Sequence, residues 1–145
     1  MKKSLSILLV FLWLFVVYGM SSFDADISQS QSNIVVNLIN ELFNISNIDT
    51  INTISFIVRK TAHFCEYLIL GILMYNMFHN FNKKTYIAII ICILCAICDE
   101  LYQSLIPGRS TKLLDIIIDS SGSTLGVYTL YLFIKYKPKL IKQRG

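Results

Sequence analysis

Four apolar blocks constrain this chain more than any other feature of its sequence. They cover about residues 4–20, 61–78, 85–104 and 116–134, and each approaches the roughly 20 residues that a helix needs to cross a bilayer. Hydrophobic residues make up 54% of the chain and charged residues 15%, whereas an ordinary soluble domain has about 25% charged residues. We therefore predict a single all-α domain over residues 1–145, folded as an integral membrane four-helix bundle.

The first block raises the alternative of a secretory signal peptide, because it follows the sequence MKK. Signal peptides have apolar cores of about 7 to 15 residues, followed by a cleavage site with small residues. The core here is longer, and the segment VVYGMSS is a poor cleavage site. We interpret residues 4–20 as a retained first transmembrane helix.

The distribution of basic residues predicts which side of the membrane each segment occupies. With four spans and a cytoplasmic N-terminus, nine of the 13 Lys and Arg residues are cytoplasmic, and every Asp and Glu lies on or toward the outer side. Both termini, including the tail 136–145, are then cytoplasmic in a multi-pass plasma-membrane protein. The net charge of +4 reflects this sorting, so we expect no nucleic-acid partner. The nine residues are Lys2, Lys3, Lys83, Lys84, Lys135, Lys137, Lys139, Lys142 and Arg144.

The extracellular segment 21–58 is the longest stretch outside the predicted spans. Within it, Ile34, Leu38, Leu42 and Ile45 recur at helical spacing, with most of the neighbouring Asn and Glu residues off that stripe. This pattern predicts a short amphipathic helix in the first extracellular loop. Such a helix could lie on the outer membrane surface or cap the bundle.

The four cysteines do not indicate a metal site or a disulfide framework. Cys92, Cys95 and Cys98 belong to one predicted span, where their spacing distributes the thiols across one side of a helix. Cys65 lies on another span. We interpret all four as small apolar packing residues.

Ionisable residues at the predicted spans are the feature most informative for function. Each costs about 2.5 to 3.5 kcal/mol at a helix centre, so such residues usually face a cavity or a partner. At 1.5 Å per residue, those of three spans lie roughly 18 to 30 Å from the cytoplasmic helix ends, which places them in one outer layer. They are Lys60, His63 and Glu66 on the second span, Asp99 and Glu100 on the third, with the neutral amide Gln103 beside them, and Asp115 and Asp119 on the fourth.

Two local motifs connect this polar layer with the fourth span. Pro107 and Gly108 form a turn that we expect to fold Arg109 back over the polar residues. Further along, Gly122 and Gly126 form a small-xxx-small element, which lets a neighbouring helix approach closely. We predict that these two glycines serve packing rather than ligand contact.

The combined motifs resemble the VanZ-like family of membrane proteins. The resemblance is carried by RKTAHFCEYLILG on the second span, by DELYQSLIPGRSTKLLDIIIDSSGSTLG from the third into the fourth, and by the serine-rich MSSFDADISQSQS. It implies a cell-envelope protein of the kind associated with teicoplanin (glycopeptide) resistance in Gram-positive bacteria. The family has no agreed molecular activity, so the resemblance implies no reaction. The signature positions it implies are His63, Glu66, Asp99, Glu100, Gln103, Arg109 and Asp115.

Asp119 departs from this resemblance, because the family favours an asparagine there. The additional carboxyl implies either that Asp119 is protonated or that it pairs with a nearby base such as Arg109 or Lys112.

Two non-catalytic hypotheses fit the outer polar layer. One is a structural ion-pair network, since buried charges must be paired. The other is a binding site for an anionic ligand, such as a membrane lipid or a lipid-linked cell-wall precursor. Arg109 offers a guanidinium suited to bidentate phosphate binding, and Arg59, Lys60 and Lys112 add positive charge. The predicted ligand-binding residues are Lys60, His63, Glu66, Asp99, Glu100, Gln103, Arg109 and Asp115.

The third hypothesis is a membrane-embedded hydrolase or transferase. His63, Glu66, Asp99 and Glu100 are its candidate catalytic residues, either as acid–base groups or as ligands of a divalent metal. Against it, Asp99 and Glu100 are adjacent and point about 100° apart on a helix, and no Ser or Cys lies in a recognisable nucleophile motif. The sequence therefore favours binding over catalysis, with no cofactor and no metal ligands assigned.

Overall fold

The structure is a computed structural model that describes residues 3–45, 47–78, 81 and 84–142, with the side chains of Ala25 and residues 138–142 left out. Within these residues the chain forms five helices and no strand, so the all-α prediction is confirmed. The helices are α1 (Lys3–Ser21), α2 (Ala25–Phe43), α3 (Ile48–Met77), α4 (Lys84–Gln103) and α5 (Leu113–Lys142).

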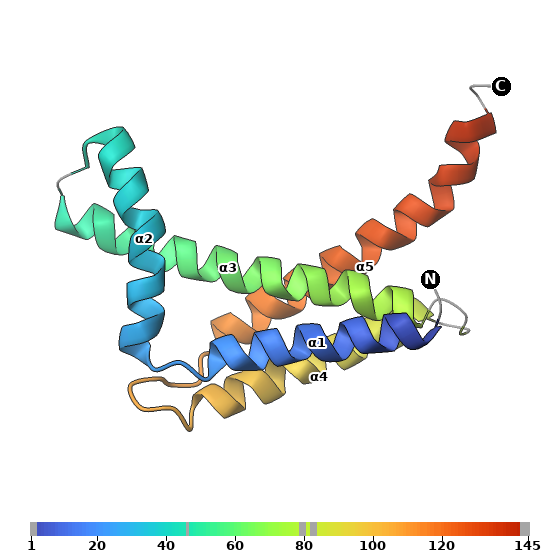
Figure 1. Ribbon diagram of the computed structural model, residues 1–145, viewed down its shortest axis with the longest axis horizontal. Helices are drawn as coiled ribbons and strands as arrows, with labels where there is room; N and C mark the ends of the chain where they lie inside the picture. The colour runs from blue at the N-terminus through green and yellow to red at the C-terminus, as the bar shows by residue number, and fades with distance from the viewer. Residues whose placement is uncertain (1–2, 46, 79–80, 82–83, 143–145) are drawn as a thin grey trace.

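Helix α3 lies at the centre of the molecule and contacts each of the other four helices. Figure 1 shows α1, α3 and α4 running side by side, while α5 packs against α3 and α4 and its C-terminal end projects beyond the bundle. Helix α2 is placed crosswise at the end of the bundle where α4 ends and α5 begins. The core is formed mainly by α3, with Tyr67, Leu70, Met74 and Tyr75 fully buried against residues such as Cys92 of α4.

Two of the described helices, α1 and α4, are long and apolar enough to cross a membrane, with mean hydropathies of 2.1 and 2.0. They match the predicted spans 4–20 and 85–104 closely. Helices α3 and α5 contain the other two predicted spans but also carry charged and hydroxyl residues along their length. The arrangement of four spans therefore stays a prediction.

A polar cap, rather than the edge of the apolar block, decides where the long helix α3 begins. Helix α3 starts at Ile48, well before the predicted span 61–78, because the Asn47 side chain accepts hydrogen bonds from the backbone N–H groups of Asp49 and Thr50 at 2.9 and 3.3 Å. These bonds satisfy N–H groups that lack partners within the helix. The end of the predicted loop 21–58 is therefore helical.

Helix α2 is the predicted helix of the first loop, but its apolar stripe does not cover the bundle. Ser32 and Val36 are its buried residues, whereas Ile34 and Leu42 are 67% and 77% exposed and Leu38 is exposed as well. Helix α2 instead covers the end of the bundle through its other face, which carries Ser32 and Val36 and packs on α3. Contact of the stripe with the outer membrane surface stays a prediction.

Close packing of α3 against α5 depends on glycine. A Cβ atom added to Gly126 would overlap the backbone carbonyl of Leu68, and one added to Gly122 would overlap that of Phe64. On the facing helix, Gly71 meets the backbone of Ser123 in the same way. The predicted packing role of the small-xxx-small element is confirmed, since the two backbones touch directly.

Lysines gather with aromatic rings at the end of the bundle away from α2. Lys3, Lys84, Lys135 and Lys137 each lie over an aromatic ring, 5.4 to 5.8 Å from its centroid. Aromatic residues and lysines together are typical of a membrane–water interface. The other basic residues assigned to the cytoplasmic side lie outside the residues or side chains that the structure describes: Lys2, Lys83, Lys139, Lys142 and Arg144.

Candidate functional site

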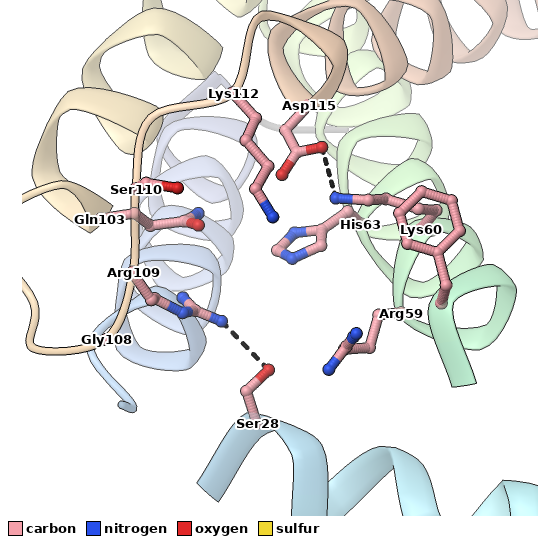
Figure 2. A pocket seen from close by; sticks show the side chains of 11 residues that line it. Ser28, Arg59, Lys60, His63, Gln103, Gly108, Arg109, Ser110, Lys112 and Asp115 are labelled. Atoms are coloured by element: carbon pink, nitrogen blue, oxygen red, sulfur yellow. Dashed lines mark hydrogen bonds and ion pairs between the residues drawn. The ribbon is translucent and has the colours of Figure 1, made fainter. Parts of the chain in front are cut away.

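A polar pocket of about 150 Å³ lies at the end of the bundle covered by α2. Four helices and the segment that connects α4 to α5 contribute to it (Figure 2). Its position agrees with the expectation that three helices carry polar side chains to one depth. The lining residues are Ser28 of α2, Phe56, Arg59, Lys60 and His63 of α3, Gln103 of α4, Gly108, Arg109, Ser110 and Lys112 of the connecting segment, and Asp115 of α5.

Positive charge dominates this pocket. Four cationic side chains line it, together with a single carboxylate, that of Asp115, which is paired with Lys60. Figure 2 shows the Arg59, Arg109 and Lys112 side chains directed toward the same space around His63. Within the part of the chain that the structure describes, no acid lies within ion-pair distance of these three cations. The lining of the pocket therefore carries more cationic than anionic side chains.

The turn after α4 fixes the position of Arg109. Gly108 has a φ of 75°, in the left-handed region that glycine adopts readily, and the Arg109 N–H donates to the Ile106 carbonyl at 3.1 Å. The guanidinium then donates from Nη1 to the Ser21 carbonyl and from Nη2 to Ser28 Oγ, both at 3.0 Å. Arg109 thus ties the connecting segment to the start of α2 while it lines the pocket.

Helix α2 also holds Arg59, on the other side of the pocket. Arg59 Nη1 donates to Gln29 Oε1, and Gln29 Nε2 donates to Ser55 Oγ at 2.8 Å. Ser55 Oγ is in turn 3.2 Å from Ser32 Oγ in a buried contact. Neighbouring residues of α2, Ser28 and Gln29, therefore orient the two guanidinium groups of the site.

Asp99 and Glu100, the adjacent acids at the end of α4, lie behind the pocket and do not line it. Both are almost completely buried, with 0% and 1% of their surface exposed. Gln103 Nε2 donates to Asp99 Oδ2 at 3.0 Å and to Ser21 Oγ at 3.1 Å. Glu100 Oε1 accepts from the Lys112 backbone N–H at 2.6 Å. One acid thus orients a pocket amide, and the other fixes the backbone of a pocket lysine.

His63 and Glu66 face the pocket region from α3. His63 Nδ1 and Glu66 Oε2 are 3.7 Å apart, and the Glu66 carbonyl accepts from Trp13 Nε1 at 2.9 Å. However, no three described His, Cys, Asp or Glu side chains are grouped closely enough to hold a metal ion. The arrangement of His63, Glu66, Asp99 and Glu100 therefore does not support the alternative of a divalent-metal site.

Asp119 is buried beneath the site on α5. It is 1% exposed, its Oδ1 has no hydrogen-bond partner, and neither Arg109 nor Lys112 forms an ion pair with it among the described residues. The expected alternative of pairing with one of these bases is therefore wrong. Burying an ionised carboxylate without a partner costs far more free energy than burying the neutral acid.

We expect Asp119→Asn to leave the folded protein as stable as the wild type, because the amide has the size of the neutral acid. Thermal unfolding in a neutral detergent measures this. Asp119→Lys is the contrasting variant and should lower the unfolding temperature strongly, since it places a longer, charged side chain at a fully buried position. An Asp119→Asn protein as unstable as Asp119→Lys would contradict a neutral Asp119.

The structure brings most, but not all, of the eight predicted ligand-binding residues to one pocket. Lys60, His63, Gln103, Arg109 and Asp115 line the polar pocket, and Glu66 lines a second pocket beside it. Asp99 and Glu100 support the polar pocket from behind. Sequence reasoning missed Ser28 and Gln29 of α2, although they lie in the serine-rich segment that contributed to the family resemblance.

These features define a helical protein with two apolar helices and a cationic pocket at one end of its bundle. The family model described as VanZ/LLP1 matches residues 6–135, and the chain belongs to this VanZ family. Family membership and the two apolar helices together indicate a membrane protein. Comparison with curated proteins and with solved structures gives no match.

Proposed function

We propose that this protein binds a phosphate-bearing ligand of the outer membrane leaflet, either a lipid or a lipid-linked cell-wall precursor, and that it thereby contributes to teicoplanin-type glycopeptide resistance. The observation that carries the proposal is the charge of the polar pocket: four cations line it with one carboxylate, and three of them have no acidic partner among the described residues. An anion is the ligand that such a pocket stabilises.

Phosphate fits the donors better than a larger or neutral group would. A guanidinium donates two parallel hydrogen bonds to phosphate oxygens, and charge-assisted bonds of this kind are about twice as strong as neutral ones. Arg59 and Arg109 face the pocket from different elements, with Lys112 between them in Figure 2. A pocket of about 150 Å³ also has the size for one phosphate group rather than an extended polyanion.

The predicted membrane topology places this pocket at the outer leaflet. The pocket and the lysine–aromatic cluster lie at opposite ends of the bundle. Because basic residues outside membrane spans concentrate in the cytoplasm, the end with Lys3 and Lys84 is assigned to the cytoplasmic side. The polar pocket then opens toward the outer face of the plasma membrane, with four spans and both termini inside.

The two other hypotheses have less support. A structural network accounts for the pair of Lys60 with Asp115, but not for the three other cations of the pocket, which have no acid within ion-pair distance among the described residues. Hydrolysis or transfer would have to rely on His63 and Glu66 alone, because the side chains of Asp99 and Glu100 hold Gln103 and the Lys112 backbone. Binding therefore accounts for more of the site.

Arg109→Lys is the substitution that tests the proposal. It keeps the positive charge but removes the planar fork, and we expect phosphate affinity to fall about tenfold, since one charge-assisted hydrogen bond contributes roughly 1.5 to 3 kcal/mol. The protein is purified in a neutral detergent, and phosphate-bearing lipids that remain bound are extracted and quantified by mass spectrometry. Titration with methyl phosphate measures the affinity directly.

The matched control is Lys137→Ala, which removes a cation from the opposite end of the bundle. Its lipid content and its affinity for methyl phosphate should equal those of the wild type. Equal binding by wild type, Arg109→Lys and Lys137→Ala would contradict a phosphate site in the polar pocket.

A further inference from the structure

A second pocket, of about 180 Å³, lies directly beside the polar pocket. Aliphatic side chains from three helices form part of its wall: Met20 of α1, Val35 of α2, and Val58 and Ala62 of α3. We call it the α1–α2–α3 groove. Met20, Val35 and Ala62 are also exposed at the surface of the molecule, so the groove is open toward the surroundings of the bundle.

The groove and the polar pocket form one continuous site. They share the lining residues Ser28, Arg59, His63 and Arg109. The same two guanidinium groups that face the polar pocket therefore stand at the entrance of the groove. A ligand whose anionic group contacts Arg59 and Arg109 has an adjoining space beside it that is partly lined by hydrocarbon.

From this geometry we propose that the ligand is an amphiphilic phosphate monoester whose hydrocarbon chain leaves the polar pocket through the α1–α2–α3 groove. The inference rests on the proposed function, because it assigns the phosphate to the polar pocket. A space of about 180 Å³ holds only the first few carbons of a chain, since cavities of about 150 Å³ take up a molecule the size of benzene. The remainder of a longer chain extends into the bilayer.

The occupant of the groove follows from its surroundings. Arg59 and Arg109 outnumber the one carboxylate of its lining, Glu66, and favour a group with a negative charge at one end, whereas its aliphatic wall favours an apolar remainder. An entirely polar ligand, such as inorganic phosphate, would leave the groove unused. An uncharged lipid would leave Arg59 and Arg109 without an anion. A single-chain phosphate satisfies both parts at once.

The test compares methyl phosphate with hexyl phosphate, two soluble monoesters that differ only in the chain. Affinities are measured by calorimetric titration of the purified full-length protein in neutral detergent. We expect the wild type to bind hexyl phosphate at least tenfold more tightly than methyl phosphate. Ala62→Phe on α3 and Val35→Phe on α2 fill the groove at exposed positions of two different helices, and each should reduce this ratio to near one.

Cys98→Phe is the matched control, because it adds the same ring at an exposed small residue of α4 outside both pockets. It should keep the wild-type ratio. Circular dichroism and gel filtration verify that each variant is folded, and having two groove variants leaves the test intact if one is not.

Each other outcome overturns the inference in a distinguishable way. Equal wild-type affinity for the two monoesters would remove the chain site while the proposed phosphate site stands. Tighter binding of hexyl phosphate that persists in both groove variants would place the chain elsewhere. If the wild type binds neither monoester, the proposed function fails, and the chain site fails with it.

Discussion

Gly126→Ala is expected to destabilise the protein by about 3 kcal/mol, at the upper end of the cost of adding one methyl group to a packed interior. The new Cβ would overlap the backbone carbonyl of Leu68, and a backbone atom cannot move aside as a flexible side chain can. Helices α3 and α5 would have to separate, which also disturbs the site, because α3 and α5 carry Lys60 and Asp115. Thermal unfolding and the amount of protein in the membrane fraction measure the effect.

Gly19→Ala provides the control within the same chain. A Cβ at Gly19 has no neighbouring atom within 4 Å, and alanine is favoured over glycine inside a helix by about 1 kcal/mol. We expect this variant to be as stable as the wild type or slightly more stable. If Gly126→Ala and Gly19→Ala unfold at the same temperature, direct backbone contact between α3 and α5 is not what holds the helices together.

Glu100→Ala is expected to reduce phosphate affinity at least tenfold without changing any residue that lines the polar pocket. Glu100 Oε1 accepts from the Lys112 N–H at 2.6 Å and so fixes the connecting segment that carries Arg109 and Lys112. A hydrogen bond to a charged or polar buried acceptor of this kind contributes roughly 1.5 to 3 kcal/mol. Without it, the segment must be ordered again each time a ligand binds. Titration with methyl phosphate measures the loss.

Glu100→Gln separates this positioning role from a role of the negative charge. The glutamine retains an oxygen acceptor of the same reach, so most of the wild-type affinity should return. Loss of affinity in Glu100→Gln equal to that in Glu100→Ala, with both proteins folded, would mean that the charge of Glu100 acts on the ligand directly.

The all-α class and the two apolar helices were predictable from local sequence, because a long run of apolar residues is itself the signal for a helix that faces hydrocarbon. Helices α1 and α4 show such runs and coincide with the predicted segments. The beginning of α3 was not predicted, since it depends on the Asn47 cap rather than on hydrophobicity. The packing role of the α5 glycines was also predictable, because their four-residue spacing is a local signal for close helix packing.

The site was predictable only in part. Spacing along each helix identified Lys60, His63 and Asp115 as members of one polar layer, and all three line the polar pocket. The bond of Gln103 to Asp99 joins helix neighbours four residues apart, which spacing can predict. Spacing could not predict that Glu100 holds the Lys112 backbone, because that bond depends on the path of the loop.

Sequence by itself determined the class of the protein, its apolar helices and the set of polar residues that meet at one end of the bundle. Only the tertiary structure decided which face of α2 is buried. The exposed Ile34–Leu42 stripe suggested one face, whereas the bonds of Gln29 and Ser32 with Ser55 hold the other against α3. That choice brings Ser28 and Gln29 to the two arginines and creates the cationic pocket, because polar contacts between distant segments leave no periodic signal in the chain.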